Sequence, residues 1–191
     1  MYLHEPKKNA GIYRYQDLIA IFNDCFAGPY NTRLVKGGDE PIYLPADEKR
    51  SYHAIFFAHG YFRSALHECA HWLIAGEARR QLEDFGYWYT PDGRTKAEQA
   101  QFLRVEVKPQ ALEWILTSAT NHPFCVSMDN LNGEETESTA FKNAVYQQVK
   151  DYCEQGLPQR AKTFFEALCQ FYNRKAVLRI EDFLHQDDDQ I

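Results

Sequence analysis

Two histidines four residues apart, His67 and His71, stand in the motif His67-Glu68-Cys69-Ala70-His71. Residues four apart lie on one face of an α-helix, so both imidazoles can reach the same metal ion. Glu68 would project from the flank of that face, close enough to hydrogen-bond a metal-bound water or a substrate. Cys69 would point to the opposite side and is not counted as a ligand. The motif predicts a divalent-metal site with Glu68 as a catalytic residue.

The residues around this motif predict a helix over 64–81. Leu66, Ala70, Leu73 and Ala78 recur at helical spacing, and Ser64 can cap the start. Such a helix would bury one face and hold the two imidazoles rigidly. The alternative is a pair of structural histidines at the edge of the core, each hydrogen-bonded to backbone or water. The helical placement and the apolar flanks favour the metal.

A third ligand is required, because two histidines alone bind a metal weakly. Glu77 follows His71 by six residues, the spacing of one zincin pattern, but Ile74 stands where that pattern has glycine. In a continuing helix Glu77 would point away from the site. A glutamate from a separate helix is the other arrangement, and Glu98 is the preferred candidate. The remaining candidates are Glu106 and His59.

Glu98 has a second interpretation. Thr95-Lys96-Ala97-Glu98 is also a capping box, in which the glutamate satisfies the start of a helix. Two histidines and one carboxylate suit either iron or zinc, and with open positions they form the facial arrangement of non-haem iron oxygenases. Composition and spacing leave the metal open between Fe(II) and zinc.

The elements that must position these groups alternate between helices and short strands. Apolar periodicity, proline and glycine predict helices over 15–27, from Thr95 onward, from Pro109 onward, over 138–155 and over 158–172. Segments 32–35 and 42–44 flank Gly37-Gly38 and are predicted to form a hairpin, 54–58 a buried strand, and 124–128 a further strand. The fold class predicted is α+β: one helix-rich domain over 1–191, with a small sheet packed against the motif-bearing helix.

Composition limits the classes of protein and partner. The 191 residues carry a net charge of −6, which argues against a direct nucleic-acid binder. No apolar run is long enough to span a membrane, and the N-terminus lacks the apolar centre of a signal peptide. The five cysteines are scattered without a CxxC pair, as expected for reduced thiols. We therefore expect a cytoplasmic protein with neither membrane nor nucleic-acid partners.

Four strings of the sequence resemble the bacterial elongation factor P hydroxylase family and occur in that family's order. They are residues 34–43 (LVKGGDEPIY), 67–72 (HECAHW), 86–94 (GYWYTPDGR) and 105–114 (VEVKPQALEW). The second and third strings are long and unusual enough to be specific. The resemblance extends from about Tyr15 to Tyr172.

The resemblance implies hydroxylation of the modified lysine of translation elongation factor P, the last step after a β-lysyl group has been attached. It implies dioxygen as co-substrate and a non-haem iron set that maps onto His67, His71 and Glu98. An aromatic wall would exclude water around the substrate, and two cationic side chains are candidates for binding a carboxylate co-substrate. These substrate-binding candidates are Tyr87, Trp88, Tyr89, Arg94 and Lys108.

Two other functions compete with this one. A cytoplasmic zinc metallopeptidase would use Glu68 as general base on a zinc-bound water. A non-catalytic module that binds a translation factor through a structural metal is the third possibility. Structural zinc sites are usually closed and rich in cysteine, and no second cysteine lies near this motif.

Overall fold

Helices pack on and beside a small sheet in the computed structural model, which describes residues 13–84, 93–128 and 138–183. The α-helices are α1 (Tyr15–Phe26), α2 (Phe62–Ile74), α3 (Lys96–Thr120), α4 (Ser138–Gln155) and α5 (Gln159–Phe171). The strands are β1 (Thr32–Lys36), β2 (Ile42–Leu44) and β3 (His53–Phe57), and the short 3-10 helices are η2 (Arg79–Gln81) and η3 (Ile180–Phe183). This architecture confirms the predicted helix-rich α+β class.

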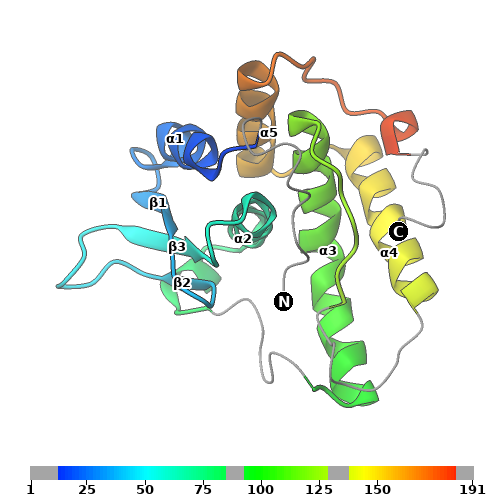
Figure 1. Ribbon diagram of the computed structural model, residues 1–191, viewed down its shortest axis with the longest axis horizontal. Coiled ribbons are helices and arrows are strands. Elements are labelled where there is room, and N and C mark those ends of the chain that lie inside the picture. Colours follow the sequence, from blue (N-terminus) through cyan, green and yellow to red (C-terminus); the bar gives the residue numbers. More distant parts are fainter. Residues whose placement is uncertain (1–12, 85–92, 129–137, 184–191) are drawn as a thin grey trace.

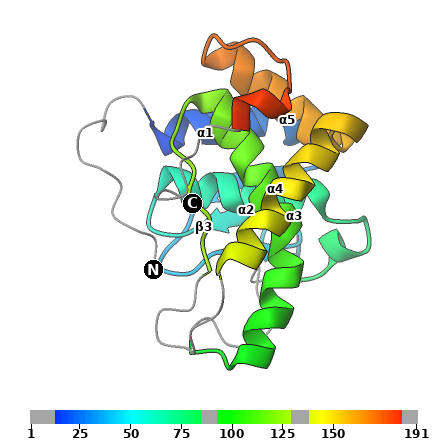
Figure 2. The ribbon, with the colours of Figure 1, turned by 90° about the vertical axis from the view of Figure 1, so that its right-hand side faces the viewer.

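The sheet, α2, α3 and α4 follow one another as successive layers, with α1 and α5 packed at one end (Figure 1). The view turned by 90° shows α2 crossing the middle of α3, while the first turns of α3 extend beyond it (Figure 2). The apolar faces of α1, α2, α3 and α5 meet in one buried core. The helix that carries the two histidines is therefore packed on both sides. No helix among the described residues is both long and apolar enough to cross a membrane.

The predicted hairpin between 32–35 and 42–44 is wrong. The strand order is β1-β3-β2, with β1 parallel and β2 antiparallel to β3. The apolar strand β3 occupies the centre, where both of its edges are paired and three of its five side chains are buried. Gly37 makes no hairpin turn. It allows close packing against β3, because a Cβ at Gly37 would lie 3.1 Å from the Cβ of Phe56.

Helix α2 is shorter than the predicted helix over 64–81. It begins at Phe62 after Tyr61, and the hydroxyl of Ser64 accepts a hydrogen bond from the Ala58 amide at 3.0 Å instead of capping the helix. It ends at Ile74 because the guanidinium of Arg160 donates to the last carbonyls, among them those of Trp72 and Leu73 at 3.1 Å each. A tertiary contact from α5 thus supplies the C-terminal cap that the local sequence lacks.

Helix α3 is a single helix of 25 residues with Pro109 inside it, so the prediction of a new helix beginning at Pro109 is wrong. Proline removes one backbone hydrogen bond from a helix interior. Packing against α2, α4 and α5 buries this part of α3 and outweighs that loss.

Segment 124–128 forms no strand among the described residues, contrary to prediction. It runs along α3, where the Gln110 side chain bonds both the carbonyl and the amide of Ser127 at 2.6 and 3.0 Å. The side-chain amide of Gln99 donates a hydrogen bond to the backbone carbonyl of Met128 at 2.6 Å. Helix side chains replace the strand partner for these backbone groups.

Candidate metal centre

Three potential metal ligands converge where α2 meets α3. His67 and His71 come from α2 and Glu106 comes from α3. The Nε2 atoms of the two histidines lie 3.1 Å apart. Glu106 Oε1 lies 3.1 Å from Nε2 of His71, and Oε2 lies 3.5 Å from Nε2 of His67. The four-residue spacing thus places both imidazoles on one helix face, as predicted, and a carboxylate meets them from the neighbouring helix.

The spacing of these nitrogen and oxygen atoms fits one metal ion. Nitrogen and oxygen ligands at about 2.1 Å from a metal, at angles of about 90–110°, lie about 3.0–3.4 Å from one another. The observed separations of 3.1–3.5 Å agree with this. Glu106 Oε2 is buried and accepts no hydrogen bond from the described residues. A cation bound between the histidines would satisfy that oxygen.

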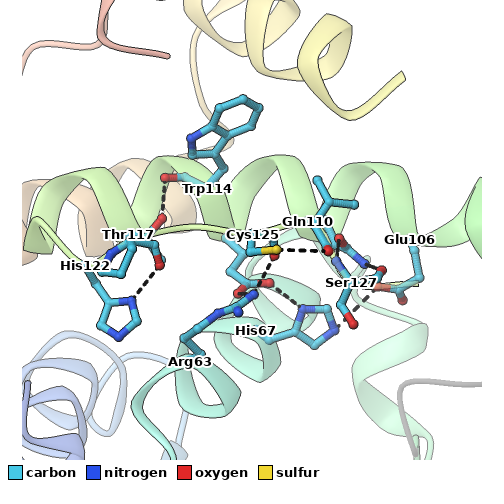
Figure 3. A network of polar contacts seen from close by, with 12 residues as sticks. Arg63, His67, Glu106, Gln110, Trp114, Thr117, His122, Cys125 and Ser127 are labelled. Atoms are coloured by element: carbon cyan, nitrogen blue, oxygen red, sulfur yellow. Dashed lines mark hydrogen bonds and ion pairs between the residues drawn. The ribbon is translucent and has the colours of Figure 1, made fainter. Parts of the chain in front are cut away.

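A second carboxylate of α3 orients the first histidine. Glu113 Oε2 lies 2.9 Å from Nδ1 of His67, and Arg63 reaches the other oxygen of Glu113 at 3.4 Å. Arg63 also donates to the Cys125 carbonyl at 2.6 Å, which ties segment 124–128 to this network (Figure 3). Because a carboxylate only accepts, Nδ1 carries a proton, and in the neutral ring the lone pair of Nε2 would face the centre. Metal-bound histidines commonly have such an outer partner.

The electrostatics of the cluster favour positive charge. Burial lowers the pKa of His67, but the Glu113 hydrogen bond and the charges of Glu106 and Glu113 outweigh it and raise the pKa to about 10. Burial likewise opposes protonation of His71, and Glu106 raises its pKa nevertheless. The pKa of Glu106 is lowered, because the charge and hydrogen bond of His71 exceed the cost of its burial. In the absence of metal, protons supply the positive charge that a metal would bring.

Glu68 lies beside this cluster, on the side that faces the sheet. Its side chain is buried, with 7% of the residue exposed. Burial raises the pKa of Glu68 to about 7 against the opposing effect of His67 and His71. Together with His71, Glu68 lines a small cavity. Cys69, by contrast, lies in the apolar core, in keeping with its exclusion as a ligand.

The structure does not bring Glu98 to the histidines. Glu98 Oε2 accepts hydrogen bonds from the Thr95 amide at 3.0 Å and from its hydroxyl at 2.8 Å, which completes the capping box at the start of α3. Glu98 precedes Glu106 by eight residues, or about 12 Å along the helix axis. The geometry therefore favours the alternative, Glu106, as the carboxylate of the centre.

The other candidates lie apart from the centre or outside the described residues. Arg94 is buried at the start of α3, where it donates to Gln99 at 2.7 Å and lies over the ring of Phe102. Lys108 is exposed on α3. His59 is partly exposed and 3.6 Å from Asp39, outside the cluster. Tyr87, Trp88 and Tyr89 fall within residues 85–92, which the structure does not describe.

Comparison with known proteins shows the family of this chain. The sequence pattern of the family described as elongation factor P hydroxylase matches residues 21–183. A protein of Haemophilus influenzae named elongation factor P lysine hydroxylase is 57% identical over 171 residues, which cover 90% of this chain and 96% of that protein. The chain belongs to the elongation factor P hydroxylase family. The resemblance seen in the four sequence strings is thereby confirmed.

The match to the elongation factor P hydroxylase family spans every residue of the converging cluster.

Two residues of the site, Glu113 and Arg63, were not predicted from the sequence. Glu106 and Glu113 are seven residues apart, so on a helix they share a face, and this spacing was the available clue. Pro109 between them suggested a helix boundary instead, which hid the shared face.

Proposed function

We propose that this chain hydroxylates a lysine of translation elongation factor P and that it does so with a divalent metal, Fe(II), bound by His67, His71 and Glu106. The substrate follows from the family and from the name of the Haemophilus influenzae relative. The metal dependence rests on one observation above all, the convergence of two imidazole nitrogens and the two oxygens of one carboxylate, with the nitrogen–nitrogen contact at 3.1 Å and the two nitrogen–oxygen contacts at 3.1 and 3.5 Å.

Two histidines and one carboxylate are the facial set of non-haem iron oxygenases, and iron in this set supplies activation of dioxygen for insertion of oxygen into a C–H bond. In this proposal Glu106, and not the preferred candidate Glu98, is the third ligand. Zinc fits the same atoms, so the identity of the metal belongs to the proposal and to its test.

The chain's own residues prepare the site for such a reaction. Glu113 holds the His67 ring in one tautomer and one orientation, and Arg63 holds Glu113. The apolar side chains of α2 and α3 bury the cluster and limit the access of bulk water. Glu68 faces the cavity beside His71 and is available to the substrate.

The test is to incubate the iron-loaded protein in air, with a reductant, together with elongation factor P carrying a β-lysylated lysine, and to weigh the intact product. We expect a gain of one oxygen atom. His67→Ala and His71→Ala should abolish the gain. His59→Asn is the matched control, because His59 lies outside the cluster and asparagine tolerates its positive φ of 54°.

A product of unchanged mass from folded, iron-loaded protein would contradict the proposal. Cleavage of the factor without added oxygen would point to the peptidase chemistry that the motif also permits. Activity with zinc alone would contradict the assignment of Fe(II).

A further inference from the structure

Glu68 is the acidic group of the site that the metal cluster does not use. It follows the ligand His67 in sequence, and its carboxylate accepts no hydrogen bond within the part of the chain that the structure describes. A carboxylate removed from water in this way needs a compensating donor or charge. We infer that the cavity beside His71 receives a positively charged amino group of the β-lysyl group on the substrate lysine, with Glu68 as its anionic partner. This inference rests on the proposed function.

The cavity lies between α2 and the edge of the sheet. It is lined by Tyr43, Ile55, Glu68, His71, Trp72 and Asp84, and by Ala75 and two arginines at the end of α2. Its volume is about 30 Å³. That is enough for one or two groups the size of a water molecule, and an ammonium group is of that size.

The two arginines of the wall are engaged elsewhere. Arg79 donates to Asp84 at 2.7 Å. Arg80 donates to the Ala75 carbonyl at 2.9 Å, and its guanidinium lies over the ring of Tyr30. Neither arginine donates a hydrogen bond to Glu68 in the described structure. Asp84 is paired with Arg79, so Glu68 is the acid of the lining that neither arginine neutralises.

This position suits an amine close to the reacting carbon. The cavity shares His71 with the metal cluster, so an amino group bound there lies next to the centre and would hold the modified lysine side chain beside it. A charge-assisted hydrogen bond is strong in a site shielded from water. An acetylated amine carries no charge and would leave Glu68 without compensation, so the cavity would select a substrate whose β-lysyl amine is free and cationic.

The experiment measures equilibrium binding of β-lysylated elongation factor P to the metal-loaded protein without oxygen, so that binding is scored apart from turnover. Glu68→Gln keeps the shape of the side chain and removes its charge. Glu83→Gln is the matched control, since Glu83 is an exposed acid near the same wall and outside the cavity lining. The substrate is used with its amino groups free or acetylated.

We expect Glu68→Gln to keep its metal and to raise the Kd for the free-amine substrate about tenfold or more, as loss of a charged hydrogen-bond partner does. Glu83→Gln should bind as the wild type does. Acetylation should weaken wild-type binding about tenfold and weaken binding to Glu68→Gln far less. In Glu68→Asp, a shorter carboxylate should restore part of the affinity and of the discrimination.

Equal Kd values for wild type and Glu68→Gln, or equal discrimination against the acetylated substrate, would overturn the inference. Loss of metal from Glu68→Gln would also overturn it, because Glu68 would then serve the metal centre. Selective amine binding without any oxygen gain in air would leave this inference standing and would reject the proposed hydroxylation instead.

Discussion

The first turns of α3 and its centre carry glutamates in opposite environments. At the start, Glu98 is partly exposed and its carboxylate is satisfied by Thr95 of its own capping box. At the centre, Glu106 is buried, and one of its oxygens has no hydrogen-bond donor among the described residues. The same residue type thus caps a helix at one end and faces two histidines further along.

The difference comes from what lies beside each part of the helix. The start of α3 extends beyond α2, whereas its centre is packed against α2 (Figures 1 and 2). A buried carboxylate must meet positive charge, and the imidazoles of α2 provide the place for it. Position along the helix, and not residue type, decides which glutamate can join a metal centre.

The largest expected effect comes from removing the central carboxylate. Glu106→Ala should lose bound iron and with it oxygen transfer, because two histidines alone hold a metal weakly. Metal analysis after gel filtration, together with product mass, measures both. One iron per chain in folded Glu106→Ala would remove Glu106 from the ligand set and return Glu98 to consideration.

Much of this comparison could be predicted from the sequence. The four-residue spacing of His67 and His71 is a local property of one helix, and it placed both imidazoles correctly. The capping box of Thr95 and Glu98 is equally local, and the structure confirms it. Such features depend on residues within one or two helical turns of each other, and these neighbours can be read directly from the sequence.

The parts that could not be predicted depend on packing between distant segments. The end of α2 is fixed by Arg160 of α5, and the continuation of α3 through Pro109 is fixed by three neighbouring helices. The choice of Glu106 over Glu98 follows from where α3 crosses α2, a relation that no local pattern encodes. The position of β3 between β1 and β2 also depends on packing between distant segments, because strand order is set by the burial of the whole sheet.

A smaller effect is expected one contact further from the centre. Glu113→Ala leaves the three ligands in place but removes the acceptor of the His67 Nδ1 proton. Loss of such an outer partner typically costs 10–100-fold in metal affinity or activity. Competition with a metal-binding dye measures the affinity. Wild-type affinity in Glu113→Ala would show that packing alone orients His67.

The comparison also predicts a dependence on pH in the metal-free protein. His67 has a folded pKa of about 10 and an ordinary value of 6.5, so its protonation stabilises the fold fully below pH 6.5. This contribution is lost as the pH rises toward 10. Each kcal/mol lost lowers Tm by about 2–4 °C in a chain of this size, and a fall of roughly 5 °C or more is expected.

The metal-loaded protein is the control for that titration, because a metal on Nε2 of His67 would take the place of the proton that is lost in the metal-free protein. Its Tm should fall less over the same range, so that the difference between the two forms widens as the pH rises. A constant difference from pH 6.5 to pH 10 would show that His67 is not protonated in the metal-free fold.

The smallest effect is expected at the other end of α3. Thr95→Ala removes the N-cap hydroxyl that accepts from the Glu98 amide, and such a loss costs about 1 kcal/mol, or about 2–4 °C in Tm. Metal content and oxygen transfer should stay at the wild-type level, because the first turns of α3 lie outside the cluster. Thr95→Ser, which keeps the hydroxyl, should restore the Tm. If Thr95→Ala instead lost its metal while remaining folded, the two parts of α3 would be coupled, and the separation between a capping glutamate and a metal-facing glutamate would not hold.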